Sequence, residues 1–168
     1  MGKIPTILAL LFCLGAVFAN EDLRVADSCY AARAENANGD KADKRNAELM
    51  TSKYRAAMKD PAVAEKATEG YVKSMFFTIR FAGIEKNSRM KTLDSMKMQA
   101  EDAYRKYPGN RQIAHAYASL LSMWGNERGA LTSIKEGVAN TVRDVATAAE
   151  DWQVLGRAHF VLPYVPLI

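Results

Sequence analysis

The chain has 168 residues, of which 49% are hydrophobic and 25% are charged, so its length and composition suit one folded domain and argue against disorder, collagen or several domains. The 10 glycines and 5 prolines are few beside the helix-forming Ala, Glu, Lys and Met residues, and β-branched runs are scarce. We therefore expect an all-α protein. A formal net charge of +4 is too weak a basic bias to indicate nucleic-acid binding.

The first 19 residues have the pattern of a secretory signal peptide. Lys3 precedes an apolar run over residues 7–14, and small residues lead up to Ala19. A positive start, a short apolar stretch and an A-x-A-like site predict cleavage after Ala19. We therefore expect an exported protein, periplasmic or secreted, with an uncleaved N-terminal anchor as the alternative. After cleavage Cys29 is the only cysteine, so an internal disulfide is excluded.

Breaker residues divide the rest of the chain into predicted helices. The first, over residues 22–36, ends at asparagine and glycine residues, which favour helix ends. The second, over residues 40–59, ends at Asp60-Pro61, because proline cannot continue the hydrogen-bond ladder. The third, over residues 62–86, carries an apolar stripe at three- to four-residue spacing: Val72, Met75, Phe76, Ile79 and Gly83.

Two further predicted helices follow the third. One covers residues 91–107 and ends at Pro108-Gly109-Asn110. The next continues to about residue 124 and presents one apolar face: Ile113, Ala116, Tyr117, Leu120 and Leu121. Each apolar face must pack against a neighbouring helix.

The sixth predicted helix covers residues 127–137, with an extension towards residue 145, and its inward side is Ala130, Leu131, Ile134 and Val138. The last covers residues 147–162 and is followed by an apolar extended tail, residues 163–168, which contains two prolines. Seven helices joined by short turns predict successive antiparallel helical hairpins.

Two of these helices share a spacing pattern. The last contains Trp152-x-x-Leu155-Gly156-x-x-His159, and the fifth has Ala114, Tyr117, Ala118 and Leu121 at the same spacing, with Gly125 followed by Ala130. The pattern resembles the tetratricopeptide repeat, a helix pair that stacks into solenoids. The resemblance implies about three helix pairs plus a C-terminal helix, forming one short solenoid over residues 20–162.

The resemblance also implies a binding surface. Proteins of the tetratricopeptide type bind a peptide or partner protein in a concave groove lined by the first helix of each pair. Carried onto the matching positions of this chain, the groove residues are Gln112, His115, Ser119, Ser122, Glu150, Gln153 and Arg157. The implied function is an exported scaffold for protein–protein or peptide binding, in cell-envelope assembly or transport.

The sequence contains no zinc-type histidine pair, Cys-x-x-Cys, glycine-rich phosphate loop or Gly-x-Ser-x-Gly elbow. We therefore expect no enzymatic activity, no metal and no cofactor. Three alternatives stay open. The first is peripheral contact with an anionic membrane or cell-wall polymer, and the second is a structural role in which the apolar tail docks on another subunit or on the chain's own groove. The third is an enzyme or small-ligand-binding protein whose pocket lies between helices and is lined by Tyr71, Phe76, Phe77 and Phe81. Self-association is also open.

Overall fold

The computed structural model describes residues 20–161, which are helical apart from turns and one isolated bridge between Asn38 and Lys41. This confirms the predicted all-α class. The predicted signal peptide and the apolar tail lie outside the described residues. The helices are α2 (Glu21–Ala31), α3 (Lys44–Ala57), α4 (Ala64–Phe81), α5 (Lys86–Lys106), α6 (Arg111–Arg128), α7 (Ala130–Lys135), α8 (Val138–Ala148) and α9 (Trp152–Val161).

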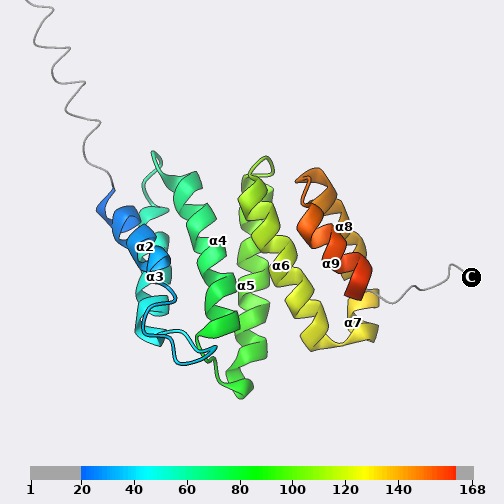
Figure 1. Cartoon of the computed structure of the whole chain (residues 1–168). Helices are drawn as coiled ribbons and strands as arrows, with labels where there is room; N and C mark the ends of the chain where they lie inside the picture. Colours follow the sequence, from blue (N-terminus) through cyan, green and yellow to red (C-terminus); the bar gives the residue numbers. More distant parts are fainter. Residues whose placement is uncertain (1–19, 162–168) are drawn as a thin grey trace, which may run out of the picture.

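The helices stack as hairpins in two rows (Figure 1). Helices α2, α4, α6 and α9 form the first row, in which each helix contacts the next. Helices α3, α5 and α8 form the second row, and each packs against two helices of the first. Within the described part of the chain, the second-row helices make no contact with one another, so the stack curves with the first row on its inner side.

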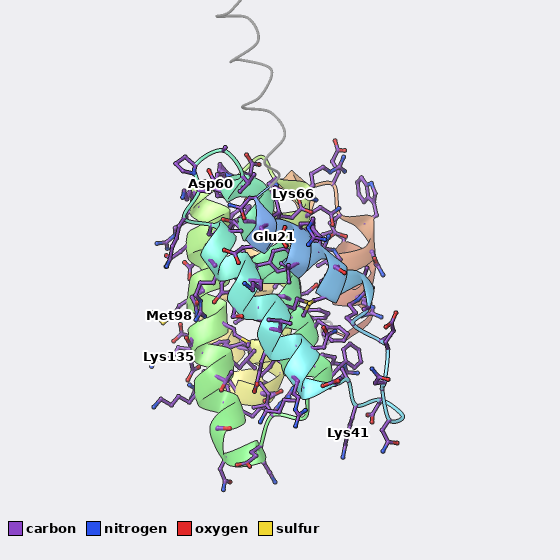
Figure 2. The ribbon with its side chains drawn as sticks, turned by 90° about the vertical axis from the view of Figure 1, so that its left-hand side faces the viewer. Glu21, Lys41, Asp60, Lys66, Met98 and Lys135 are labelled. Atoms are coloured by element: carbon purple, nitrogen blue, oxygen red, sulfur yellow. The ribbon has the colours of Figure 1, made fainter. Side chains whose placement is uncertain are left out.

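The hydrophobic core lies between the two rows. Figure 2 looks along the stack from the α2–α3 end and places Met98 of α5 at the outer edge of the second row. The apolar residues predicted to face inward from α6 are all buried, as are Val72, Met75 and Ile79 of α4. The prediction of an inward stripe is therefore confirmed for α6 and, at these three positions, for α4, where Phe76 is half-buried. No helix within residues 20–161 has the length and apolar character of a membrane span.

Glycines with positive φ end helices at other positions than predicted. The fifth predicted helix does not stop at residue 124 but continues through Gly125 to Arg128, where Gly129 follows. The third predicted helix stops at Phe81 instead of residue 86, and Gly83, expected in its apolar stripe, is an exposed turn residue with φ +64°. The sixth predicted helix is two helices, because Gly129 (φ +87°) ends α6 and Gly137 (φ +66°) separates α7 from α8. Positive φ is easily adopted by glycine and interrupts the regular ladder.

This break also overturns the predicted inward side of the sixth helix. Leu131 and Ile134 are 86% and 70% exposed, and Ala130 is exposed too. Of the four residues predicted to face inward, only Val138 is buried. It lies on α8 and packs against α6, where a Cβ on Gly125 would lie 3.0 Å from Val138 Cγ1. The close approach at Gly125 therefore accommodates α8, and α7 turns its apolar side chains outward.

Other helix ends differ because turns have their own hydrogen bonds. Helix α2 ends at Ala31, not residue 36, and α3 begins at Lys44, not residue 40. The Ala42 N–H in this connection donates to the Phe81 carbonyl at 2.9 Å. Helix α5 begins five residues earlier than predicted, at Lys86. Helix α9 begins at Trp152, not residue 147, because a turn at residues 149–151 separates it from α8.

Candidate functional site

The predicted groove residues of α6 lie on one side of that helix. Gln112 is exposed, and His115, Ser119 and Ser122 are half-buried, whereas Ile113, Ala114 and Ala116 between them are buried. Spacings of three and four residues place these polar side chains on the same face. That face belongs to the inner row of helices.

A surface hollow of about 490 Å³ lies where the start of α6 meets the turn between α8 and α9. It is lined by Arg111, Gln112, His115, Ala149, Glu150, Asp151 and Gln153. The structure therefore brings together Gln112, His115, Glu150 and Gln153 of the predicted groove residues. Ser119, Ser122 and Arg157 do not line this hollow, and the Ser122 hydroxyl donates to the Ala118 carbonyl of its own helix at 2.8 Å.

The first wall of the hollow is the capped start of α6. The Asn110 side-chain oxygen accepts hydrogen bonds from the Gln112 and Ile113 N–H groups, both at 3.1 Å. This is the usual arrangement of an N-cap, and it follows a Pro-Gly pair that ends α5. The Asn110 amide nitrogen also donates to Glu65 at 3.1 Å, which ties the start of α6 to α4.

The second wall is the turn between α8 and α9, which has the hydrogen bonds of a Schellman motif. The Asp151 N–H donates to the Ala146 carbonyl at 2.8 Å, and the Glu150 N–H donates to Thr147 at 3.0 Å. Glu150 has φ +52°, a left-handed conformation that glycine usually occupies at this position. Asp151 then caps α9 by accepting from the Val154 N–H at 3.1 Å.

Two side-chain links hold the walls together. His115 Nδ1 lies 2.5 Å from Asp151 Oδ2, and Arg111 Nε donates to the Ala149 carbonyl at 2.7 Å. Arg111 also reaches the Glu150 carboxylate at 3.1 Å. Because one Asp151 oxygen caps α9 and the other contacts His115, this largely buried carboxylate is fully engaged.

The side-chain amides of Gln112 and Gln153 are the groups in the hollow that remain available. Among the described residues, no side chain hydrogen-bonds to either amide, and both residues are exposed. Each amide offers a donor and an acceptor, the pair that a peptide backbone requires. The hollow can therefore bind a polar, uncharged group from two sides.

Two residues that line the hollow, Arg111 and Asp151, were not predicted. Asp151 directly precedes the tryptophan at which α9 begins, and that position is an N-cap signal. It was not recognised because the predicted helix began earlier, at residue 147. Arg111 carried no local signal, since its partners Ala149 and Glu150 are far along the chain and only the stacking brings them together.

Two of the four aromatic residues proposed to line a ligand pocket, Tyr71 and Phe77, contact different neighbours. The Tyr71 hydroxyl accepts from Arg55 of α3 and donates to Gln99 of α5 at 2.6 Å, so it faces the second row. The Phe77 ring instead packs on Phe81, with centroids 5.2 Å apart. None of the four residues lines the hollow described above.

Comparison with known proteins does not identify this site. No group of three or more His, Cys, Asp or Glu residues that could hold a metal ion is found over residues 20–161. The chain matches no family model, no curated protein and no solved structure. What the hollow does must therefore follow from its own geometry.

Proposed function

We propose that this protein is an exported scaffold of stacked helical hairpins, of the tetratricopeptide type, that binds an extended segment of a partner protein along its inner row of helices. The packing order carries the proposal: α2, α4, α6 and α9 touch in sequence, while α3, α5 and α8 are spread apart behind them. A peptide on the inner side can therefore contact several helices at once. The amides of Gln112 and Gln153 and the imidazole of His115 lie on that side.

The other end of the same row offers different chemistry. Arg33 lies 4.4 Å from the centroid of the Tyr30 ring and 6.0 Å from that of Phe77. Lys73 of α4 lies 5.4 Å from the same Tyr30 centroid. These cations over aromatic rings favour an acidic or aromatic side chain of the bound segment. A segment crossing the row would meet polar amides at α6 and α9, and cations and rings at α2 and α4.

The export part of the proposal is supported by the start of α2. Cleavage after Ala19 would leave Asn20, whose side chain accepts from the Leu23 N–H at 3.0 Å and donates to Asp60 at 3.0 Å. The domain would therefore keep its first cap after processing. Mass spectrometry of the protein from an exporting host should give a chain that begins at Asn20, and a chain that keeps residues 1–19 would contradict cleavage.

Site-specific photo-crosslinking tests the binding surface. A photo-reactive amino acid is placed at Gln112, Ser119 or Gln153 in the native compartment, with Met98 on the outer row as the control position. We expect all three inner positions to crosslink to the same partner and Met98 not to do so. Equal crosslinking from Met98, or none from the inner positions at normal protein levels, would contradict the proposal.

A pair of substitutions adds a quantitative test. Replacing Gln112 and Gln153 together by alanine removes exposed amides that hold no other described side chain, so the fold should be unchanged. We expect capture of the partner from Ser119 to fall about tenfold, which corresponds to about 1.4 kcal/mol. Unchanged capture would show that the amides of the hollow take no part.

A small polar ligand is the second candidate, because the hollow has the volume of known ligand pockets. Its lining is mostly polar, whereas such pockets are mostly apolar, so we favour the peptide. Crosslinking from Ser119, which lies outside the hollow, separates the two candidates, since a small ligand would leave that position without a protein partner.

A further inference from the structure

The connection between α2 and α3 contains a short hairpin. The Asn38 N–H donates to the Lys41 carbonyl at 2.8 Å, and the Lys41 N–H donates to the Asn38 carbonyl at 3.1 Å. Gly39 and Asp40 form the turn between them, and Gly39 has φ +63°. A glycine with positive φ at the first of two turn residues is typical of a type II′ hairpin. All four residues are exposed, so the hairpin lies on the surface.

Two groups of this hairpin that can react with each other are not held by any contact. Within the described chain, neither the side-chain amide of Asn38 nor the backbone N–H of Gly39 takes part in a hydrogen bond. A Cβ on Gly39 would meet no atom within 4 Å, so the space around this residue is open. Because glycine has no side chain to block the approach, its nitrogen can reach Cγ of Asn38 and close a five-membered ring.

The other asparagines of the described chain each lack one of these two conditions. Asn20 and Asn110 use their side chains as helix caps, and the Asn46 side chain donates to the Cys29 carbonyl. In the others, the N–H of the following residue donates to a carbonyl of its own helix or turn: Asn36, Asn87, Asn126 and Asn140. Asn38 is also the only asparagine that a glycine follows. Among residues 20–161 it alone combines an unheld amide with an unheld neighbouring N–H.

We propose that Asn38-Gly39 is a site of spontaneous modification, at which the asparagine deamidates through a cyclic succinimide. The Gly39 nitrogen loses its proton to the solvent and attacks Cγ of Asn38, which forms a new C–N bond. The side-chain nitrogen leaves and takes up a proton, so that ammonia is released. Water then adds to either carbonyl carbon of the ring and breaks its bond to the ring nitrogen. The products are aspartate and isoaspartate, and solvent water is the co-reactant.

Isoaspartate at position 38 disrupts the hairpin. It inserts a methylene group into the main chain, and the carbonyl that accepts from the Lys41 N–H becomes part of a free carboxylate. The two hydrogen bonds between Asn38 and Lys41 then cannot both keep their geometry. The adjoining Ala42 N–H donates to the Phe81 carbonyl, so the loosened segment extends to the end of α4. The proposal is independent of peptide binding, because Asn38 and Gly39 do not line the hollow.

Ageing of the full chain, purified from an exporting host, in mildly alkaline buffer made with heavy-oxygen water tests the proposal. Tandem mass spectrometry of peptides should show the change from amide to acid at Asn38 first, with uptake of heavy oxygen and two products of equal mass. Asn36 is the matched internal control, since it lies in the same exposed connection but the Ala37 N–H after it donates to Ala34. Reaction of Asn36 as fast as Asn38, or a single product at Asn38, would overturn the proposal.

One variant and a structural measurement complete the test. Asn38→Gln changes an exposed side chain without a described partner and keeps the amide, but its ring would need six members, so we expect the acidic form of the aged protein to be lost on isoelectric focusing. Hydrogen exchange at Lys41 should accelerate in the aged natural chain and stay unchanged in the aged variant, with α6 unaffected in both. An acidic form that accumulates equally fast in Asn38→Gln, or unchanged exchange at Lys41 in the isoaspartate form, would contradict the proposal.

Discussion

The two ends of the stack are held together in different ways. At the α2–α4 end, Tyr54 of α3 is buried, its ring packs on Gly70 of α4, and its hydroxyl donates to Asp27 of α2 at 2.7 Å. At the α9 end, the prominent aromatic residue, Trp152, is exposed, and polar links at one turn join α9 to α6. Val154 of α9 is buried, so apolar packing contributes at this end too, but without a buried aromatic ring.

Further polar links strengthen the first end. Lys53 donates to Asp22 at 2.7 Å, and the Asn46 side chain donates to the Cys29 carbonyl at 3.1 Å. Burial, and then the hydrogen bond to Asp27, raise the pKa of the Tyr54 hydroxyl well above its usual value. Tyr54 therefore stays a neutral donor at neutral pH. We expect α2–α4 to be the more stable end and α9 the first helix to open.

Truncating the aromatic residue at each end should have the largest and most unequal effects. Tyr54→Ala removes a buried ring and leaves a cavity, so we expect a loss of about 3–5 kcal/mol in unfolding free energy. Trp152→Ala, at an exposed position, should cost less than about 0.5 kcal/mol. Urea unfolding at low protein concentration measures both, and equal losses would remove the distinction between the two ends.

Replacing a glycine by alanine should change the free energy of unfolding in opposite directions at the two ends. A Cβ on Gly70 would overlap the Tyr54 ring, and such overpacking costs about 1–3 kcal/mol. Gly156→Ala meets no neighbour and should stabilise the helix by about 0.5–1 kcal/mol. Thermal and urea unfolding of each variant give the sign of the change in unfolding free energy. Stabilisation by Gly70→Ala would show that Tyr54 can move aside without loss.

The turn at the α9 end depends on one carboxylate. Asp151→Ala removes the cap of α9 and the contact with His115, and we expect a loss of about 1 kcal/mol. Hydrogen exchange should accelerate in α9 and stay unchanged in α3, because the loss is local. Asp151→Asn keeps an oxygen for the cap and serves as the matched control. Faster exchange in α3 as well would mean that the two ends unfold together.

The smallest effect is expected between the two ends, at Asp94 of α5. Hydrogen bonds from Arg128, and then from Trp124, hold the pKa of the Asp94 carboxyl below its usual value. The Asp94 carboxylate therefore contributes to the free energy of unfolding at pH values above its unfolded-state pKa. This contribution is lost as the pH falls through the lower pKa of the folded state. Because the carboxylate is partly exposed, we expect less than about 1 kcal/mol. Asp94→Asn should flatten the loss of stability in acid, measured by urea unfolding from neutral pH downward, and an unchanged slope would contradict this.

Local sequence features predicted most of the framework because they act over a few residues. Asp60-Pro61 and Pro108-Gly109-Asn110 ended helices near the predicted positions, and the apolar spacing of α4 and α6 identified their buried faces. The prediction of a single sixth helix was wrong because helix-forming residues lie on both sides of Gly129 and Gly137. Their positive φ values depend on how α7 and α8 fit against α6, which periodicity does not describe.

The candidate site, too, could be predicted from the sequence only in part. The spacing of Gln112, His115 and Ser119 along one helix follows from the sequence, because a helix repeats every 3.6 residues. The hollow itself depends on contacts between residues 36 to 39 positions apart, such as His115 with Asp151 and Arg111 with Glu150. The sequence alone thus determined most of the helices and the inward faces of α4 and α6, since these need only local hydrogen bonds and apolar spacing. Which faces stay open, at the hollow and at Trp152, was decided by the tertiary structure, because burial depends on the helices that pack alongside.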